Sequence, residues 1–152
     1  MDTKALETLI RRYEQITLDI NLKIRLLIQK EFGEELTGDQ HIIARYIMEH
    51  DKCTNTELAK VFYVKKSAIT AMTTRLFNKG MIKRRRDNKD RRIVYLSLTQ
   101  EGREFITTCD QKAMAIVAEF IDRFEGTEIE QFFQTYEKLN NILTLKLGKL
   151  EE

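Results

Sequence analysis

The chain has 152 residues, of which 42% are hydrophobic and 33% charged, and it contains no proline. This composition is typical of a soluble, helix-rich globular protein, and no apolar run approaches the roughly 20 residues of a membrane span. Two cysteines, Cys53 and Cys109, are too few for a disulfide framework and favour a reducing compartment. The N-terminus lacks the apolar core of a signal peptide, so we expect a cytoplasmic protein.

The basic residues are concentrated in one short window. The chain has a net charge of +2, yet residues 79–92 hold eight basic residues against Asp87 and Asp90: Lys79, Lys83, Arg84, Arg85, Arg86, Lys89, Arg91 and Arg92. The rest of the chain is therefore net acidic. A mildly acidic body with one concentrated basic element favours a localised contact with a polyanion.

Apolar residues recur at helical intervals from Thr3 to about Glu31, which predicts one long amphipathic helix that ends at Gly33. This helix is apolar on more than one side and therefore needs more than one neighbour. Thr37-Gly38-Asp39-Gln40 then predicts a capping box. The helix that it starts is expected to direct four residues inward: Ile42, Ile43, Tyr46 and Ile47.

A second capping box, Thr54-Asn55-Thr56-Glu57, opens a short helix from Asn55 to Phe62. A break at Tyr63-Val64 separates it from a second helix, Lys65 to Gly80. The second helix turns Ile69, Met72 and Leu76 toward the core. Its opposite face is small and hydroxylated, with Arg75 on its flank: Ser67, Thr70, Ala71, Thr74 and Asn78. Because no acidic residue lies between Lys65 and Arg86, we expect this face to contact something negatively charged.

Two strands are expected next, Met81 to Arg86 and Arg91 to Leu98, joined by the turn residues Asp87-Asn88-Lys89-Asp90. Side chains alternate along the second strand, with Val94, Leu96 and Leu98 on one face. Helix, turn, helix and basic ribbon is the element order of a winged helix-turn-helix. Such a unit places its second helix in the DNA major groove and its ribbon against the minor groove.

Two further helices are predicted after the ribbon, the first capped by Thr99 and ending at Gly126, the second opened by a capping box at Thr127-Glu128-Ile129-Glu130. These helices and the N-terminal one carry too much apolar surface for one small unit, which favours burial against a second copy. We therefore predict a mainly α fold with three parts: an N-terminal dimerisation helix (1–34), a winged helix-turn-helix with a small β-hairpin wing (35–98) and C-terminal dimerisation helices (99–152), interlocked into one domain.

The stretch from Thr56 to Gly102 resembles the MarR family of bacterial winged-helix regulators. The matching residues before the wing are Glu57-Leu58-Ala59, Val64, Ser67, Ile69-Thr70, Arg75-Leu76, Lys79-Gly80 and Ile82. In the wing they are Arg86-Asp87, Asp90-Arg91-Arg92, Leu98-Thr99 and Gly102, and this part is the more specific. The flanking helices have the family's number and order, so the resemblance covers the whole length.

The resemblance implies a homodimer that binds double-stranded DNA at a pseudo-palindromic operator and regulates, typically represses, bacterial genes. Its major-groove contacts would come from Lys65, Lys66, Ser67, Thr70, Ala71, Thr74 and Arg75, and its wing contacts from Arg84, Arg86, Lys89, Arg91 and Arg92. Asp90 would pair with a neighbouring arginine and brace the wing. The resemblance also implies a small lipophilic anionic or phenolic ligand that binds between the subdomains and lowers DNA affinity. Tyr13, Ile16, His41 and Tyr46 could line its pocket, although aromatic residues in such positions are more often core.

The sequence departs from the family pattern in two places. Tyr63 stands where many members carry glycine in the inter-helix turn, which costs roughly 1 kcal/mol or more if its φ is positive. Lys65 stands where many members carry a Ser or Thr cap, although Val64 can compensate by packing on Ile69.

Several other interpretations are open. The basic ribbon could be a solvated edge, and the hydroxylated face a tolerant surface. His50-Asp51-Lys52-Cys53 offers too few ligands for a metal and instead predicts a helix end and a small strand. Cys109 falls on an apolar face and is expected to be buried.

No catalytic constellation or phosphate loop is present, so we predict no enzyme and no cofactor. The alternatives from other classes are a helical interaction or adaptor protein that kept the fold without binding DNA, and a structured-RNA binder. The intact basic wing disfavours the first. The second lacks a set of exposed stacking aromatics, since Tyr95 is the single candidate.

Overall fold

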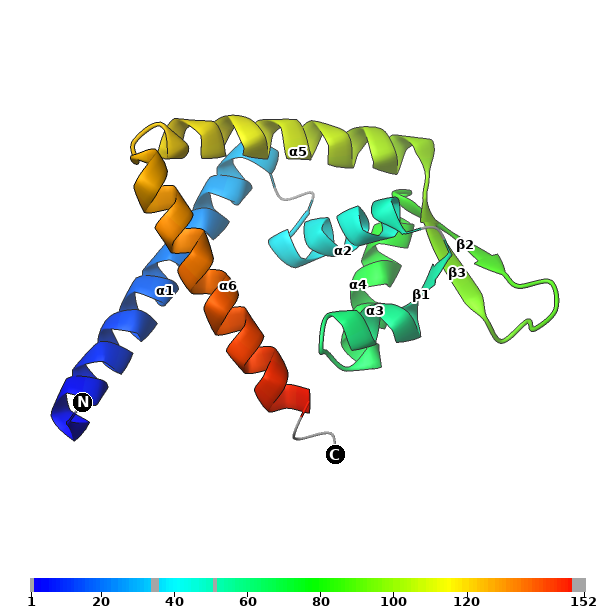
Figure 1. Cartoon of the computed structure of the whole chain (residues 1–152). Helices are drawn as coiled ribbons and strands as arrows, with labels where there is room; N and C mark the ends of the chain where they lie inside the picture. The colour runs from blue at the N-terminus through cyan, green and yellow to red at the C-terminus, as the bar shows by residue number, and fades with distance from the viewer. Residues whose placement is uncertain (1, 34–35, 51, 149–152) are drawn as a thin grey trace. The chain divides into compact units, whose positions relative to one another are not determined.

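The computed structural model describes residues 2–33, 36–50 and 52–148 (Figure 1). Its elements in chain order are α1 (Thr3–Phe32), α2 (Gly38–Glu49), β1 (Cys53–Thr54), α3 (Asn55–Val61), α4 (Lys66–Asn78), β2 (Ile82–Arg86), β3 (Val94–Leu98), α5 (Gln100–Ile121) and α6 (Gly126–Gly148). The predicted mainly α fold with a small antiparallel sheet is confirmed. The chain divides into two compact units, 1–109 and 110–152, each described by itself below.

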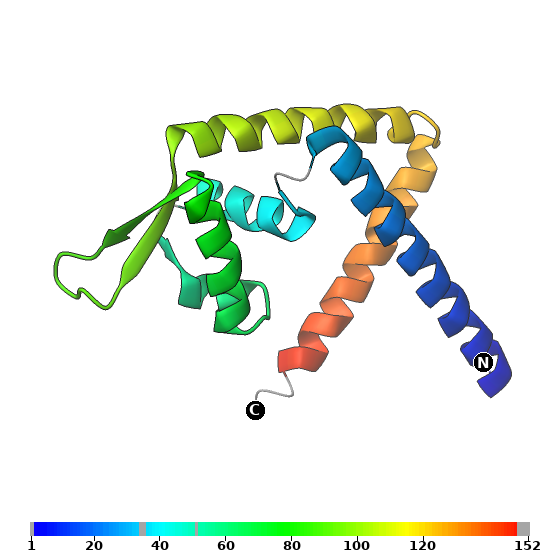
Figure 2. The same ribbon diagram turned by 180° about the vertical axis from the view of Figure 1, so that it is seen from behind.

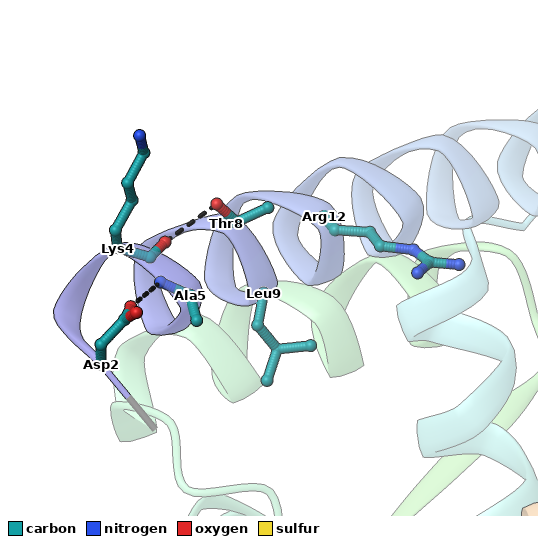
Figure 3. Close-up of a pocket in the computed structure, with 6 residues that line it drawn as sticks. All are labelled: Asp2, Lys4, Ala5, Thr8, Leu9 and Arg12. Carbon is teal, nitrogen blue, oxygen red and sulfur yellow. Dashed lines mark hydrogen bonds between the residues drawn. The ribbon is translucent and has the colours of Figure 1, made fainter.

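Helix α1 confirms the predicted long N-terminal helix. Asp2 caps it by accepting a 2.7 Å hydrogen bond from the backbone N–H of Ala5 (Figure 3), and Gly33 ends it with a φ of 67°. The periodicity did not identify Asp2 as the cap. Both apolar edges of α1 remain exposed in the single chain, as at Leu9 (54%) and Leu18 (59%).

The capping box at the start of α2 is present as predicted. The Thr37 hydroxyl accepts from the Gln40 backbone N–H at 3.3 Å, and the Gln40 side chain accepts from the Thr37 N–H at 3.2 Å. The inward face consists of Gln40, Ile43, Ala44 and Ile47. The expectation that Ile42 points inward is wrong, since Ile42 is 54% exposed. At about 100° per residue, the four inward residues fall within one arc of about 100°, and Ile42 lies on the opposite side of the helix.

Helices α3 and α4 form the predicted pair, packed through the fully buried side chains of Leu58, Ile69 and Leu76. The Thr54 hydroxyl accepts from the Glu57 N–H at 3.2 Å, which is the first of the two bonds in the predicted capping box. The turn after α3 is a Schellman motif, in which the backbone N–H groups of Tyr63 and Val64 reach back to carbonyls in the last turn of α3. Tyr63 adopts a φ of 51°, the conformation that normally selects glycine.

The three strands form an antiparallel sheet in the order β1-β3-β2. Ile82, Leu96 and Leu98 face the core, as the predicted alternation requires, and the hairpin of β2 and β3 extends beyond the helices of this unit (Figure 2). Strand β3 begins at Val94, three residues later than predicted. The Ile93 N–H donates to the Asp90 carbonyl and the Asp87 N–H donates to the Ile93 carbonyl, so residues 87–93 close into a loop.

The beginning of α5 packs tightly against the sheet. The Thr99 hydroxyl accepts from the Gly102 N–H at 3.0 Å, which confirms the predicted cap. A β-carbon at Gly102 would overlap the carbonyl group of Met81, so only glycine permits this approach. Ile106 and Cys109 complete the buried face of α5 in this unit.

The second unit contains the remainder of α5 and helix α6. Helix α5 ends at Ile121 rather than continuing to Gly126. The capping box predicted at Thr127–Glu130 is wrong: α6 begins at Gly126, and the Glu128 carboxylate accepts from the Glu125 N–H at 2.9 Å. Glycine therefore serves as the first helical residue. No side chain between Gly126 and Gly148 is buried, and the apolar set of α6, including Phe132, remains exposed.

Candidate nucleic-acid interface

Helix α4 presents the hydroxylated face that the sequence predicted. Ser67, Thr70, Ala71 and Asn78 are exposed and Thr74 is half-buried, while Ile69 and Leu76 on the other side are fully buried. Arg75 lies exposed on the flank. Lys65 makes no side-chain capping hydrogen bond, as expected for lysine at this position. The N-terminal turn of α4 is therefore basic and faces solvent.

Thr73 is fully buried and was missed by the sequence interpretation. Its hydroxyl donates to Asn55 Oδ1 at 3.0 Å, and the Asn55 amide donates to the Thr70 hydroxyl at 3.4 Å. Asn55 therefore connects the first residue of α3 to the middle of α4. Thr73 lies four residues after Ile69 and three before Leu76, so the helical period alone could have placed it in the core. No local sequence pattern predicts the contact of Thr73 with Asn55.

The Thr70 hydroxyl is already engaged in the free protein. It donates to the Lys66 carbonyl at 2.8 Å in the preceding turn and accepts from Asn55. A base contact by Thr70 would therefore exchange one of these bonds for one to DNA.

Arg84 connects the first wing strand to α4. Its guanidinium donates to the Thr74 hydroxyl at 2.9 Å and lies 4.8 Å from the centroid of the Phe77 ring. A guanidinium over an aromatic face gains a cation–π contact. Sequence reasoning placed Arg84 and Thr74 in the interface separately and did not predict that they meet.

The wing loop is organised by its two aspartates. Asp87 accepts from the backbone N–H groups of Asp90 and Lys89, and these bonds lower its carboxyl pKa. Asp90 accepts from Nε and Nη2 of Arg92, both at 3.0 Å, and this pair lowers the pKa of Asp90. Asp90 therefore pairs with a neighbouring arginine, Arg92, as the prediction of a wing brace requires.

The wing arginines differ in whether they pair with an aspartate. Arg92 holds the loop, whereas Arg91 is exposed and has no carboxylate partner within the described part of the chain. Arg86 and Lys89 are also exposed. Arg86, Lys89 and Arg91 are therefore available to a polyanion at this end of the hairpin, and Arg92 is 90% exposed although it pairs with Asp90.

The predicted ligand pocket is not assembled in the single chain. Tyr13 and Ile16 are exposed on α1. His41 is half-buried on α2, and Tyr46 stacks on the His50 ring, with centroids 3.9 Å apart. The hollow of about 400 Å³ at the start of α1 includes none of the four residues (Figure 3). The pocket stays a prediction.

Both cysteines are buried, as expected for Cys109. Burial raises the pKa of Cys53 to about 11, with a further contribution from Glu57, so this thiol is protonated at neutral pH. His50 is the C-cap of α2 and Cys53 is the first residue of β1, so the predicted helix end and small strand are present. Asp51 lies outside the described residues. Within residues 2–33, 36–50 and 52–148, no group of three metal-ligating side chains is found, and no helix is long and apolar enough to cross a membrane.

An exposed, acid-free helix beside a braced basic hairpin, both mounted on one small helical core, defines a winged helix-turn-helix protein. Residues 36–94 match the sequence model of the MarR family. Over these residues the chain is similar to the MarR family.

Individual relatives show the same similarity. The HTH-type transcriptional repressor MdtR of Bacillus subtilis is 36% identical over 97 residues, which cover 59% of this chain and 63% of MdtR. The uncharacterized HTH-type transcriptional regulator YpoP of the same organism is 28% identical over 136 residues, covering 89% and 91% of the two chains. The fold is similar to that of Streptococcus pneumoniae FabT in complex with DNA, with a TM-score of 0.77 at 21% identity over 91% of this chain and 97% of FabT.

Proposed function

We propose that this protein is a sequence-specific, double-stranded DNA-binding transcriptional regulator that acts as a homodimer on a pseudo-palindromic operator and represses bacterial genes. The observation that carries the proposal is the acid-free surface formed by α4 and the wing. From Lys65 to Arg86 the chain holds no carboxylate, and the two wing aspartates are engaged within the loop. An adaptor that had lost DNA binding would have no reason to keep this surface.

We expect two kinds of contact with DNA, one from α4 and one from the wing. The hydroxyl and methyl groups on α4 suit base edges in the major groove, with Lys65, Lys66 and Arg75 on phosphates. The exposed Arg91 suits a narrow, A-tract minor groove, where the negative potential is strongest.

The proposed dimer follows from the apolar surface of the terminal helices. Tyr13 (55% exposed) on α1 and Phe132 (55%) on α6 belong to apolar faces without a partner among the described residues. A second copy covers such faces and supplies a second α4, and two-fold symmetric sites require two recognition helices. The same geometry supports release by a lipophilic anion that prefers the DNA-incompetent spacing of the two helices.

Selection of bound sequences from a random DNA pool tests this function. We expect one enriched pseudo-palindrome whose half-sites lie about one helical turn apart, or a multiple of it. The same protein with Ser67→Glu and Ala71→Glu, which add carboxylates to the exposed face of α4, is the matched control and should enrich nothing. A wild-type chain that folds, dimerises and enriches no sequence would favour the adaptor function instead. Salicylate-like and fatty-acid ligands are then titrated with and without the selected operator.

A further inference from the structure

The sheet has a second basic surface on the side away from α4. Neighbouring side chains of a strand point to opposite faces, so Lys83 and Arg85 lie opposite Ile82 and Arg84. Lys83 pairs with Ser97 and Arg85 pairs with Tyr95 across the β2–β3 ladder. This face forms the wall of a hollow of about 560 Å³, which Lys52, Arg84 and Arg103 also line.

Two backbone features bring the outlying cations to this hollow. Lys52 adopts a φ of 66°, an unusual conformation for a residue with a side chain, directly before β1. Gly102 allows the first turn of α5 to approach the carbonyl of Met81, which brings the following Arg103 to the sheet. Three separate segments of the first unit therefore contribute cations to one concave surface.

The hollow contains cations without matching anions. None of the residues that line it is acidic, and none of Lys52, Lys83, Arg85 and Arg103 forms an ion pair within the described part of the chain. Asp87 bonds to the Tyr95 hydroxyl at the edge of this surface and is held by the N–H groups of its own loop. Like charges gathered on one surface without carboxylates favour binding of a multiply charged anion.

The arrangement fits phosphate oxygens. Arginine forks form paired hydrogen bonds to phosphate, and lysine adds a compact charge. Ser97 adds a hydroxyl donor in the middle of the wall. Arg84 also borders the hollow, but its guanidinium is directed to α4, where it contacts the Thr74 hydroxyl. A duplex seated on α4 therefore does not require the hollow.

We propose that the hollow lined by Lys52, Lys83, Arg85, Ser97 and Arg103 binds the phosphate or diphosphate group of a small molecule. The site is distinct from the recognition helix and from the lipophilic ligand proposed above. Its existence does not depend on DNA binding by this chain.

Calorimetric titration of the full chain with inorganic pyrophosphate tests the site. We expect saturable binding that weakens at least tenfold in Lys83→Gln/Arg85→Gln. The control, Lys89→Gln/Arg91→Gln, removes the same charge from the wing loop and should bind pyrophosphate as the wild type does. Amide NMR shifts should move at Arg85 and Ser97 during the titration, and circular dichroism should show that both variants fold.

The phosphate that binds in the hollow could belong to a small molecule or to the DNA backbone. Operator affinity measured on the same samples distinguishes these two sources. Lys89→Gln/Arg91→Gln should lose operator affinity, while Lys83→Gln/Arg85→Gln should change it less than threefold at 0.15 M salt, where screening acts over about 8 Å. Absent binding, or equal loss in both variants, would overturn the proposal. Operator loss and a reduced salt slope in Lys83→Gln/Arg85→Gln would overturn it too, because the hollow would then serve the DNA backbone. A wild-type chain that binds pyrophosphate but no DNA would contradict only the proposed function.

Discussion

Arg84 Nη2 donates a 2.9 Å hydrogen bond to the Thr74 hydroxyl, and this bond joins the wing to helix α4. The same guanidinium lies over the Phe77 ring on the next turn of α4. One side chain of β2 therefore makes two contacts with α4, which restrict both the angle of the hairpin and the orientation of the Thr74 hydroxyl. The geometry of a base contact by Thr74 would therefore depend on the position of the wing.

Replacement of Arg84 by lysine should change sequence preference without changing the salt dependence of binding. Lysine keeps the charge but loses the planar fork and most of the contact with Phe77. We expect the selected operator to change at the position read by Thr74, by roughly 1–3 kcal/mol per base contact, as in Thr74→Ala. Arg86→Lys is the control, since Arg86 lies on the same strand face with no partner on α4 within the described part of the chain. Identical sequence profiles for the wild type and Arg84→Lys would contradict this coupling.

Arg91→Ala should lower operator affinity most at sites with a narrow, A-tract minor groove, and it should reduce the salt dependence of binding. Arg91 is exposed and unbraced, so its removal deletes a charge from the interface and leaves the loop intact. The slope of log K against log salt should shrink by about 0.9 for each phosphate that the protein no longer neutralises, doubled in a symmetric dimer. Thr70→Ala, which removes no charge, should keep the slope and change the base preference. Equal slopes for the two variants would show that Arg91 makes no phosphate contact.

The wing brace should open in acid. The pKa of Asp90 is below its ordinary value of 3.8 because Arg92 donates to the ionised carboxylate. The contact is therefore fully present above pH 4 and is lost as pH falls through the lowered pKa of the folded state. Amide NMR of Arg92 across pH 2 to 6 should report this single transition. Asp90→Asn should already show the open loop at pH 7, and a transition unchanged by this substitution would assign it to another carboxyl group.

Tyr63→Gly should stabilise the protein. Tyr63 and Gly80 occupy the same position of two Schellman motifs, with φ values of 51° and 72°. A non-glycine residue in this conformation costs roughly 1–2 kcal/mol, and glycine loses about 0.5–1 kcal/mol through backbone entropy. We expect a net gain of roughly 0.5–1 kcal/mol in the free energy of unfolding, measured with urea at fixed protein concentration. Gly80→Ala is the reciprocal control and should destabilise the protein.

Local sequence signals predicted the helices, most of their caps, the alternation of β3 and the exposed face of α4. Each depends on residues a few positions apart, where backbone geometry determines which side chains meet. The contacts of Asn55 with Thr73 and of Arg84 with Thr74 were not predictable, because they join residues 18 and 10 positions apart through side chains whose rotamers depend on packing. Ile42 was assigned to the wrong face for a related reason: its helix has two apolar edges, and only tertiary packing selects the buried one.

Association of two chains should be required for stability. Ile10 on α1 is 46% exposed and Leu143 on α6 is 50% exposed, and each lies within an apolar face that a lone chain leaves in water. We expect sedimentation to show a dimer at micromolar concentration, and Leu143→Lys to lose both association and thermal stability, because a buried unpaired charge opposes the contact. Lys138→Gln, on the same helix but without an apolar side chain to remove, should leave both unchanged. A wild-type chain that sediments as a stable, folded monomer at micromolar concentration would exclude the proposed dimer and the two-fold operator with it.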